Sequence, residues 1–166
     1  AMSSDLEGMK YEETIEAQLA MDEEFKKAGL VALPSEGVSP GVVNLASQYI
    51  TDQMDEVEEI GIRSITWLEA KELVAMGPTE LSIEMTLHLE PPSYYKNGKI
   101  VPLDNELSFS EEFEFPAPAK KKKIFMESVS CVEALIQRYT GKPVKRIYHR
   151  GAIFSGVSDV KEVIYR

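Results

Sequence analysis

The chain has 166 residues, of which 43% are hydrophobic and 28% charged, the size and composition of one ordinary soluble domain. Its apolar runs are far shorter than the roughly 20 residues of a membrane helix, so we expect no membrane partner. The formal net charge of −10 argues against a nucleic-acid partner, because binding to phosphates requires a basic surface.

Residues 11–28 have the pattern of an amphipathic helix, with acidic residues early, two lysines late and Gly29 as a stop signal. Ile15, Leu19 and Phe25 fall near one face of this helix. The apolar run at 30–33 predicts a short buried strand. The chain is therefore expected to open as helix, strand, loop and helix.

The stretch "EGVSPGVVNLASQYI", residues 36–50, predicts a loop followed by a second helix. We expect Ser39 to be the N-cap and Pro40 the first helical residue, since proline is favoured at that position. The side chains expected to point into the core are Val42, Val43, Leu45, Ala46, Tyr49 and Ile50.

The start of this second helix has two interpretations. Its free N–H groups and positive dipole end can receive a carboxylate or a polarised carbonyl, with Gly41 allowing close approach and Asn44 as a polar neighbour. The alternative is an ordinary helix cap, and the spacing alone favours that alternative.

The middle of the chain predicts a strand over 57–67 and a short helix over 69–76. The segment 78–89 is ambiguous. Its strict apolar alternation favours a strand, whereas Pro78 and Thr79 at its start are typical of a helix. By pattern alone the strand is preferred.

The second half is rich in predicted strands. Asn97-Gly98, between two apolar pairs, is a strong signal for a hairpin turn. Further strands are expected at 111–116, 121–129 and 143–154, and a helix at 130–139. These elements predict an α+β fold in which a largely antiparallel or mixed sheet has helices packed on one face.

The motifs of the chain exclude several chemistries. The glycines never form a dinucleotide-binding or phosphate-loop fingerprint, so we expect no complete Rossmann domain. Cys131 is the one cysteine and His88 and His149 lie far from it in sequence, so we predict no disulfide, no metal site and no cysteine–histidine nucleophile. Residues 1–5 do not have the character of a signal peptide, and a reducing cytoplasmic location fits best.

The charge is distributed unevenly. Residues 1–119 carry 24 acidic and 7 basic side chains, whereas residues 120–150 carry 9 basic and 2 acidic ones. The basic segment is interpreted as a solvated strand edge, or else as a face for an acidic surface or an anionic ligand. The solvated edge is the preferred interpretation.

Three stretches of the chain carry a resemblance to one family: "AGLVALPSEGVSPGVVNLAS", "EPPSYYKNGKIVPL" with the later "EEFEFPAPAKKKKIF", and "PVKRIYHRG". They resemble the saccharopine dehydrogenase-like oxidoreductases, which include the saccharopine, lysine 6- and carboxynorspermidine dehydrogenases. In the first stretch the matching residues are Glu23, Glu24, Lys26, Lys27, Ala28, Gly29, Gly37, Pro40, Gly41 and Asn44. The matches run in order over roughly residues 10–155.

The resemblance implies a division of the chain. Residues 1–35 would be the edge of a cofactor domain, and residues 36–166 a substrate-binding and dimerisation domain similar to the C-terminal domain of glyceraldehyde-3-phosphate dehydrogenase. NAD or NADP would bind elsewhere in the full-length protein, with no cofactor expected on this chain alone. The sequence departs from the family at Ser39, where aspartate is frequent, and lacks its proline-rich insertion after Gly61. The resemblance also favours a helix over 78–89.

The resemblance also implies a function: hydride transfer at a C–N bond of an amino acid or amine, by a homodimer, with this fragment inactive alone. The implied substrate-binding residues are Ser39, Pro40, Gly41, Asn44 and Arg150. His149 and Tyr148 are candidates for proton transfer. The alternative function is a non-catalytic interaction or assembly module that uses its basic segment.

Overall fold

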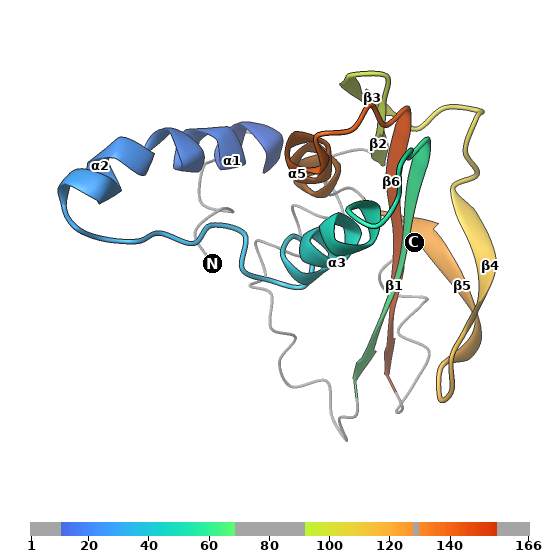
Figure 1. The fold of residues 1–166 in the computed structure, drawn as a ribbon. Helices are drawn as coiled ribbons and strands as arrows, with labels where there is room; N and C mark the ends of the chain where they lie inside the picture. Colours follow the sequence, from blue (N-terminus) through green and yellow to red (C-terminus); the bar gives the residue numbers. More distant parts are fainter. Residues whose placement is uncertain (1–10, 69–91, 128–129, 156–166) are drawn as a thin grey trace.

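The computed structural model describes residues 11–68, 92–127 and 130–155 (Figure 1). Within these ranges, side chains are described for residues 16–66, 92–127 and 132–152. Six strands form one sheet, and the helices lie on one face of it. The elements are α1 Tyr11–Ala20, α2 Asp22–Lys27, α3 Val42–Thr51, β1 Glu59–Leu68, β2 Ser93–Lys96, β3 Lys99–Pro102, β4 Ser110–Phe115, β5 Lys120–Met126, α5 Ser130–Thr140 and β6 Arg146–Ser155.

Strand β6 organises the sheet. One edge of β6 pairs in parallel with β1 along the whole strand. Its other edge is shared by β2, which pairs at Ile147, and by β5, which pairs at Gly151. The β2–β3 and β4–β5 pairs are antiparallel hairpins. The expected α+β class with a mostly antiparallel sheet is therefore confirmed.

The core lies mainly between the sheet and the helices. Ile147 of β6 packs there with Val132, Leu135 and Ile136 of α5, and Leu19 of α1 joins the same cluster. The opposite face of the sheet carries two smaller clusters. One is built around Phe115, Ala119, Ile124 and Ala152, and the other around Tyr94, Met126 and Tyr148. Alternate residues of β6 thus pack in the core beneath the helices and in the clusters on the opposite face of the sheet.

Several sequence predictions are confirmed. The predicted hairpin joins β2 to β3 through a turn at Asn97 and Gly98. Their φ angles are 46° and 95°, in the positive range that asparagine and glycine tolerate. The later strands, the helix α5 and strand β6 lie within a few residues of their expected positions. The predicted helix over 11–28 is present as α1 and α2, separated by a turn at Met21.

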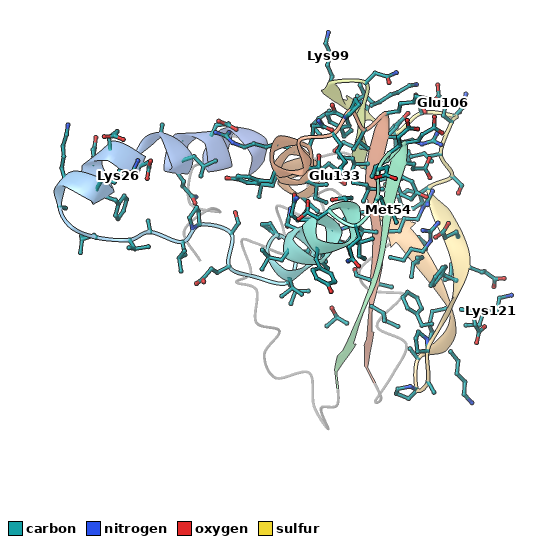
Figure 2. All side chains as sticks on the ribbon, in the orientation of Figure 1. Lys26, Met54, Lys99, Glu106, Lys121 and Glu133 are labelled. Carbon is teal, nitrogen blue, oxygen red and sulfur yellow. The ribbon has the colours of Figure 1, made fainter. Side chains whose placement is uncertain are left out.

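The predicted strand at 30–33 is wrong. This segment has no strand pairing, and Leu30, Val31 and Leu33 are 60%, 84% and 66% exposed. A short apolar run becomes a strand only if another strand offers it hydrogen bonds, and none does so in the described part of the chain. Together with α1 and α2, the segment forms an arm that extends away from the sheet, with Lys26 near its far end (Figure 2).

The expected start and inner face of the second helix also need correction. Helix α3 begins at Val42 with Gly41 as its N-cap, so Ser39 and Pro40 precede the helix rather than open it. Val43 packs against the core, and Ser47 and Thr51 are buried. Of the apolar residues expected inside, Val42, Leu45, Tyr49 and Ile50 are each at least half exposed, and Ala46 is exposed as well.

Two predictions lie outside the described residues: the helix over 69–76 and the alternative structures of 78–89. In the described ranges, no helix is both long and apolar enough to cross a membrane.

Candidate functional site

A buried histidine on β6 is the centre of the candidate site. His149 has no exposed surface, and both of its ring nitrogens have polar neighbours. Nδ1 lies 3.2 Å from Ser39 Oγ, and Nε2 lies 2.8 Å from Ser64 Oγ. The parallel register of β1 and β6 brings Ser64 opposite Gly151, on the same face as His149. Loop and sheet residues from three parts of the sequence therefore meet at one imidazole.

Glu127, directly after β5, completes this polar cluster. Its backbone N–H donates to the carbonyl oxygen of His149 at 3.0 Å, and its carboxyl Oε2 lies 3.2 Å from His149 Nδ1. Gly151 makes room for the carboxyl group, because a Cβ on Gly151 would lie 1.8 Å from Glu127 Oε1. We call Ser39, Ser64, Glu127 and His149 the polar cluster.

Burial changes the acidity of both ionisable members of the polar cluster. Removal from water raises the pKa of Glu127 to about 7 and lowers the pKa of His149 to about 4. The short distance alone resembles an ion pair, but both shifts favour the uncharged forms. Between about pH 4 and pH 7 the contact is therefore best described as a hydrogen bond between a neutral carboxyl group and a neutral imidazole.

The loop before α3 holds Ser39 in place through its backbone. The Gly37 N–H donates to the Pro40 carbonyl oxygen and the Val42 N–H donates to the Gly37 carbonyl oxygen, each at 2.9 Å. Gly41 has a φ of 134°, and a Cβ there would lie 2.0 Å from the Gly37 carbonyl oxygen. Such a tight crossing requires glycine at Gly41.

The interpretation of the α3 N-terminus as an anion receiver finds no support in its hydrogen bonds. The Gly41 N–H donates to Asn44 Oδ1 at 2.8 Å, and the Val42 and Val43 N–H groups donate to carbonyl oxygens of Gly37 and Val38. Asn44 also donates to the Val132 carbonyl oxygen of α5 at 3.0 Å. Asn44 thus caps α3 and fastens it to α5.

Beside this loop lies an apolar cavity of about 740 Å³. Gly41 and Asn44 line it, together with Leu33 from the arm, Leu45 of α3 and Leu135 of α5. The cavity and the polar cluster therefore flank the same loop. Of the residues predicted to bind substrate, Gly41 and Asn44 line the cavity. Ser39 and Pro40 precede Gly41 in the same loop, and Ser39 contacts His149 instead.

Arg150 and Tyr148 lie on the opposite face of the sheet. Arg150 is 2% exposed, donates to Glu111 Oε2 at 3.2 Å and to the Ser108 carbonyl oxygen at 2.8 Å, and stacks on the Tyr148 ring. Arg63 of β1 binds the same Glu111 carboxylate. Arg150 therefore has a protein carboxylate as its partner, and its role in substrate binding stays a prediction.

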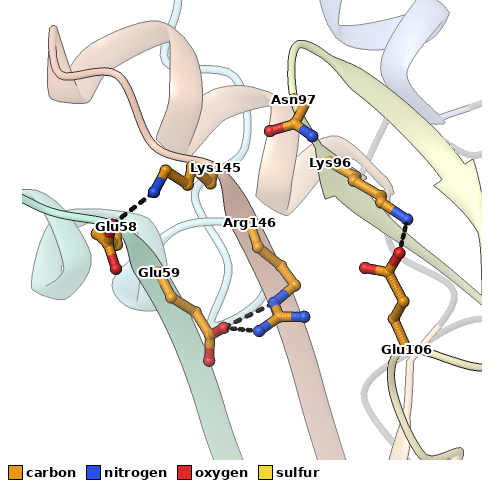
Figure 3. A pocket seen from close by; sticks show the side chains of 7 residues that line it. All are labelled: Glu58, Glu59, Lys96, Asn97, Glu106, Lys145 and Arg146. Carbon is orange, nitrogen blue, oxygen red and sulfur yellow. Dashed lines mark hydrogen bonds and ion pairs between the residues drawn. The ribbon is translucent and has the colours of Figure 1, made fainter.

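A second cavity, of about 280 Å³, is lined by charged side chains at the ends of β1, β2 and β6 (Figure 3). Glu58 pairs with Lys145, Glu59 with Arg146, and Lys96 with Glu106. Because these charges neutralise one another, the cavity is a weaker candidate for a ligand site. No group of three or more potential metal ligands occurs among the described residues.

The fold and site define an α+β domain in which two serines and a glutamate, all partly buried, surround a buried histidine beside the loop before α3. No family model matches the chain. Over 61 residues, 34% of this chain, the sequence is 34% identical to carboxynorspermidine synthase of Vibrio cholerae serotype O1. The match covers 15% of that protein, so the chain corresponds to a small part of the relative's length.

Sequence reasoning missed two members of the polar cluster, Ser64 and Glu127. Ser64 is a single hydroxyl in a strand, and Glu127 is one of 28 acidic residues, so neither has a distinguishing spacing. The sequence signal that could have found Ser64 is the alternation of β1, which places Ser64 on the same face of the strand as Ile62.

Proposed function

We propose that this chain is the substrate-binding and dimerisation domain of a saccharopine dehydrogenase-like, NAD(P)-dependent oxidoreductase that acts on a C–N bond of an amino acid or amine. The observation that carries the proposal is the contact of Ser39 with His149. Ser39 lies in the loop that resembles the family, and the contact ties this loop to a titratable group. The partial similarity to carboxynorspermidine synthase supports the same class.

The proposed reaction needs a proton as well as a hydride. A bound nicotinamide would supply or accept the hydride, while the protein must give a proton to the nitrogen or take one from it. The polar cluster contains two groups that can hold such a proton, Glu127 and His149, and two hydroxyls that can orient them. The 740 Å³ cavity, which Gly41 and Asn44 line next to the loop that carries Ser39, would give a substrate a place to bind.

The cofactor would bind to another domain, because the sequence contains no dinucleotide fingerprint. We propose that residues 1–35 belong to the edge of that domain. This would account for the exposure of Leu30, Val31 and Leu33, which that domain would cover. The exposed apolar face of α3, including Leu45 and Tyr49, would be covered by the same domain.

Calorimetric titration of this chain tests the proposal. We expect no tight binding of NAD(P)H, and measurable binding of one compound from a panel of saccharopine, lysine and carboxynorspermidine. The Ser39→Ala variant should weaken that binding, whereas Glu114→Gln, at an exposed position on β4, should not. Tight NAD(P)H binding, or equal substrate binding by both variants, would contradict the proposal.

The exposed face of α3 also favours a second candidate, a non-catalytic assembly module. In that case the apolar surface would meet a protein partner and the basic segment 120–150 an acidic one. The titration separates the two candidates, because the assembly module should bind none of the amines.

A further inference from the structure

The two proton-holding groups of the polar cluster differ in their access to solvent. The His149 side chain has no exposed surface, whereas the Glu127 side chain is 23% exposed. A group that exchanges a proton with a substrate must come within hydrogen-bond distance of it. Glu127 has exposed surface through which a substrate could reach it, whereas His149 has none.

The position of Glu127 is fixed from two sides. Its backbone is hydrogen-bonded to the His149 carbonyl oxygen, and its carboxyl group lies over Gly151, where any larger residue would displace it. A Cβ atom on residue 151 would also lie 2.9 Å from Ser64 Oγ. The absence of a side chain at Gly151 therefore lets both Glu127 and Ser64 lie close to the imidazole. The geometry is that of a built site rather than of a surface carboxylate.

We propose that Glu127 is the residue that exchanges a proton with the substrate nitrogen, and that His149 and Ser64 are positioning residues which adjust to its protonation state. This inference rests on the proposed function for the identity of the substrate. It assigns the proton to Glu127 instead of to His149 or Tyr148.

The hydrogen-bond pattern explains how the cluster follows the proton. When Glu127 is protonated, its O–H donates to His149 Nδ1, and Nε2–H donates to Ser64 Oγ. When Glu127 gives its proton to an imine nitrogen that receives a hydride on carbon, the carboxylate becomes an acceptor. The ring then carries its proton on Nδ1, and the Ser64 hydroxyl donates to Nε2. The proton returns to Glu127 from solvent or from a substrate ammonium group, so protons and electrons balance.

Other charged groups near β6 have different surroundings. Glu133 of α5, which packs on the sheet, is 1% exposed. Arg63 and Arg150 are on the far face and bind Glu111. Among these groups, Glu127 is the one that the structure brings within 3.2 Å of the His149 ring.

Nitrogen NMR of the histidine rings tests the assignment in this chain, which has only two histidines. We expect the His149 ring to change from the Nε2–H to the Nδ1–H tautomer as the pH rises through about 7. Glu127→Gln should abolish the change, and Gly151→Ala should do the same because it displaces the carboxyl group while keeping every titratable residue. Glu133→Gln is the matched control for a buried carboxyl group and should leave the change intact. A change that survives both Glu127→Gln and Gly151→Ala, or that Glu133→Gln abolishes, would overturn the proposal.

Turnover by the complete polypeptide separates this inference from the proposed function. Glu127→Gln should lower kcat by about 100-fold or more, with KM nearly unchanged, and Glu127→Asp should restore part of it. If the enzyme is active and Glu127→Gln retains full kcat, the assignment to Glu127 is wrong and the proposed function stands. If no C–N substrate is turned over by the unaltered polypeptide, the proposed function is wrong and so is the role of Glu127 with a substrate.

Discussion

Ser39 Oγ lies 3.2 Å from His149 Nδ1, although the two residues are 110 positions apart in the sequence. The contact joins the loop before α3 to the central strand of the sheet. It also turns an unremarkable serine and an isolated histidine into parts of one cluster with Glu127 and Ser64. The candidate function of the chain depends on this convergence.

The pH dependence of stability should reveal the opposed pKa shifts of Glu127 and His149. The folded pKa of His149, about 4, is below its usual 6.5, so His149 alone makes stability rise with pH between these values. The folded pKa of Glu127, about 7, is above its usual 4.5, so Glu127 alone makes stability fall across that interval. In the unaltered protein the two contributions should cancel where the intervals overlap.

Denaturant unfolding at a series of pH values measures the two contributions. Relative to the unaltered protein, Glu127→Gln should gain stability with rising pH, and His149→Asn should lose stability with rising pH, each by about 1.4 kcal/mol per pH unit in the overlap. Parallel curves for all three proteins would contradict the two pKa shifts.

The shared carboxylate on the far face of the sheet makes a second prediction. Glu111→Gln leaves Arg63 and the buried Arg150 without their common carboxylate. The free energy of unfolding should fall by about 2 kcal/mol. The loss is smaller than for a fully buried pair because the Glu111 side chain is a quarter exposed. The neighbouring Glu112→Gln removes an exposed pair with Lys121, which solvent screens, so it should destabilise the protein much less. Equal effects in thermal unfolding would show that the Arg63–Glu111–Arg150 group is not structural.

The loop before α3 makes a third prediction. Gly41→Ala should lower the free energy of unfolding by about 3 kcal/mol or more, because its Cβ would collide with the backbone of Gly37 at a positive φ. Gly29 also has a positive φ, of 68°, but the space around it is open, so Gly29→Ala should cost about 1 kcal/mol. If the two variants were equally stable, the crossing of Gly37 and Gly41 would not exist in solution.

The elements that could be predicted are those whose structure depends on residues adjacent in the sequence. The hairpin at Asn97 and Gly98 was predictable because the turn depends on two adjacent residues. The apolar run at 30–33 was not, because a strand depends on a partner elsewhere in the chain or in another domain. The start of α3 was misplaced because the N-cap is Gly41, whose N–H donates to the side chain of Asn44, and not Ser39.

The candidate site was predictable only in part for the same reason. The loop residues Ser39, Pro40, Gly41 and Asn44 were found through their resemblance to a family. Glu127 was not found, because its role depends on the pairing of β5 with β6 and on the missing side chain of Gly151. Contacts of that kind appear only once the sheet is assembled.

Association of the chain is a fourth prediction. We expect a homodimer formed through the strand-rich half, residues 92–155, and not through the arm or α3. Light scattering should give twice the mass of 18.6 kDa, and Leu45→Ser on the exposed face of α3 should leave that mass unchanged. A strict monomer at high concentration, or a dimer that Leu45→Ser dissociates, would contradict this arrangement.

Transfer of deuterium from labelled NAD(P)H tests the central claim most directly. The complete polypeptide that contains this chain is incubated with the imine of each candidate substrate, and the product is analysed by mass spectrometry. We predict one deuterium on the carbon bonded to nitrogen, with the yield strongly reduced by Glu127→Gln. Absence of label in every product would contradict the assignment of this chain to a C–N oxidoreductase.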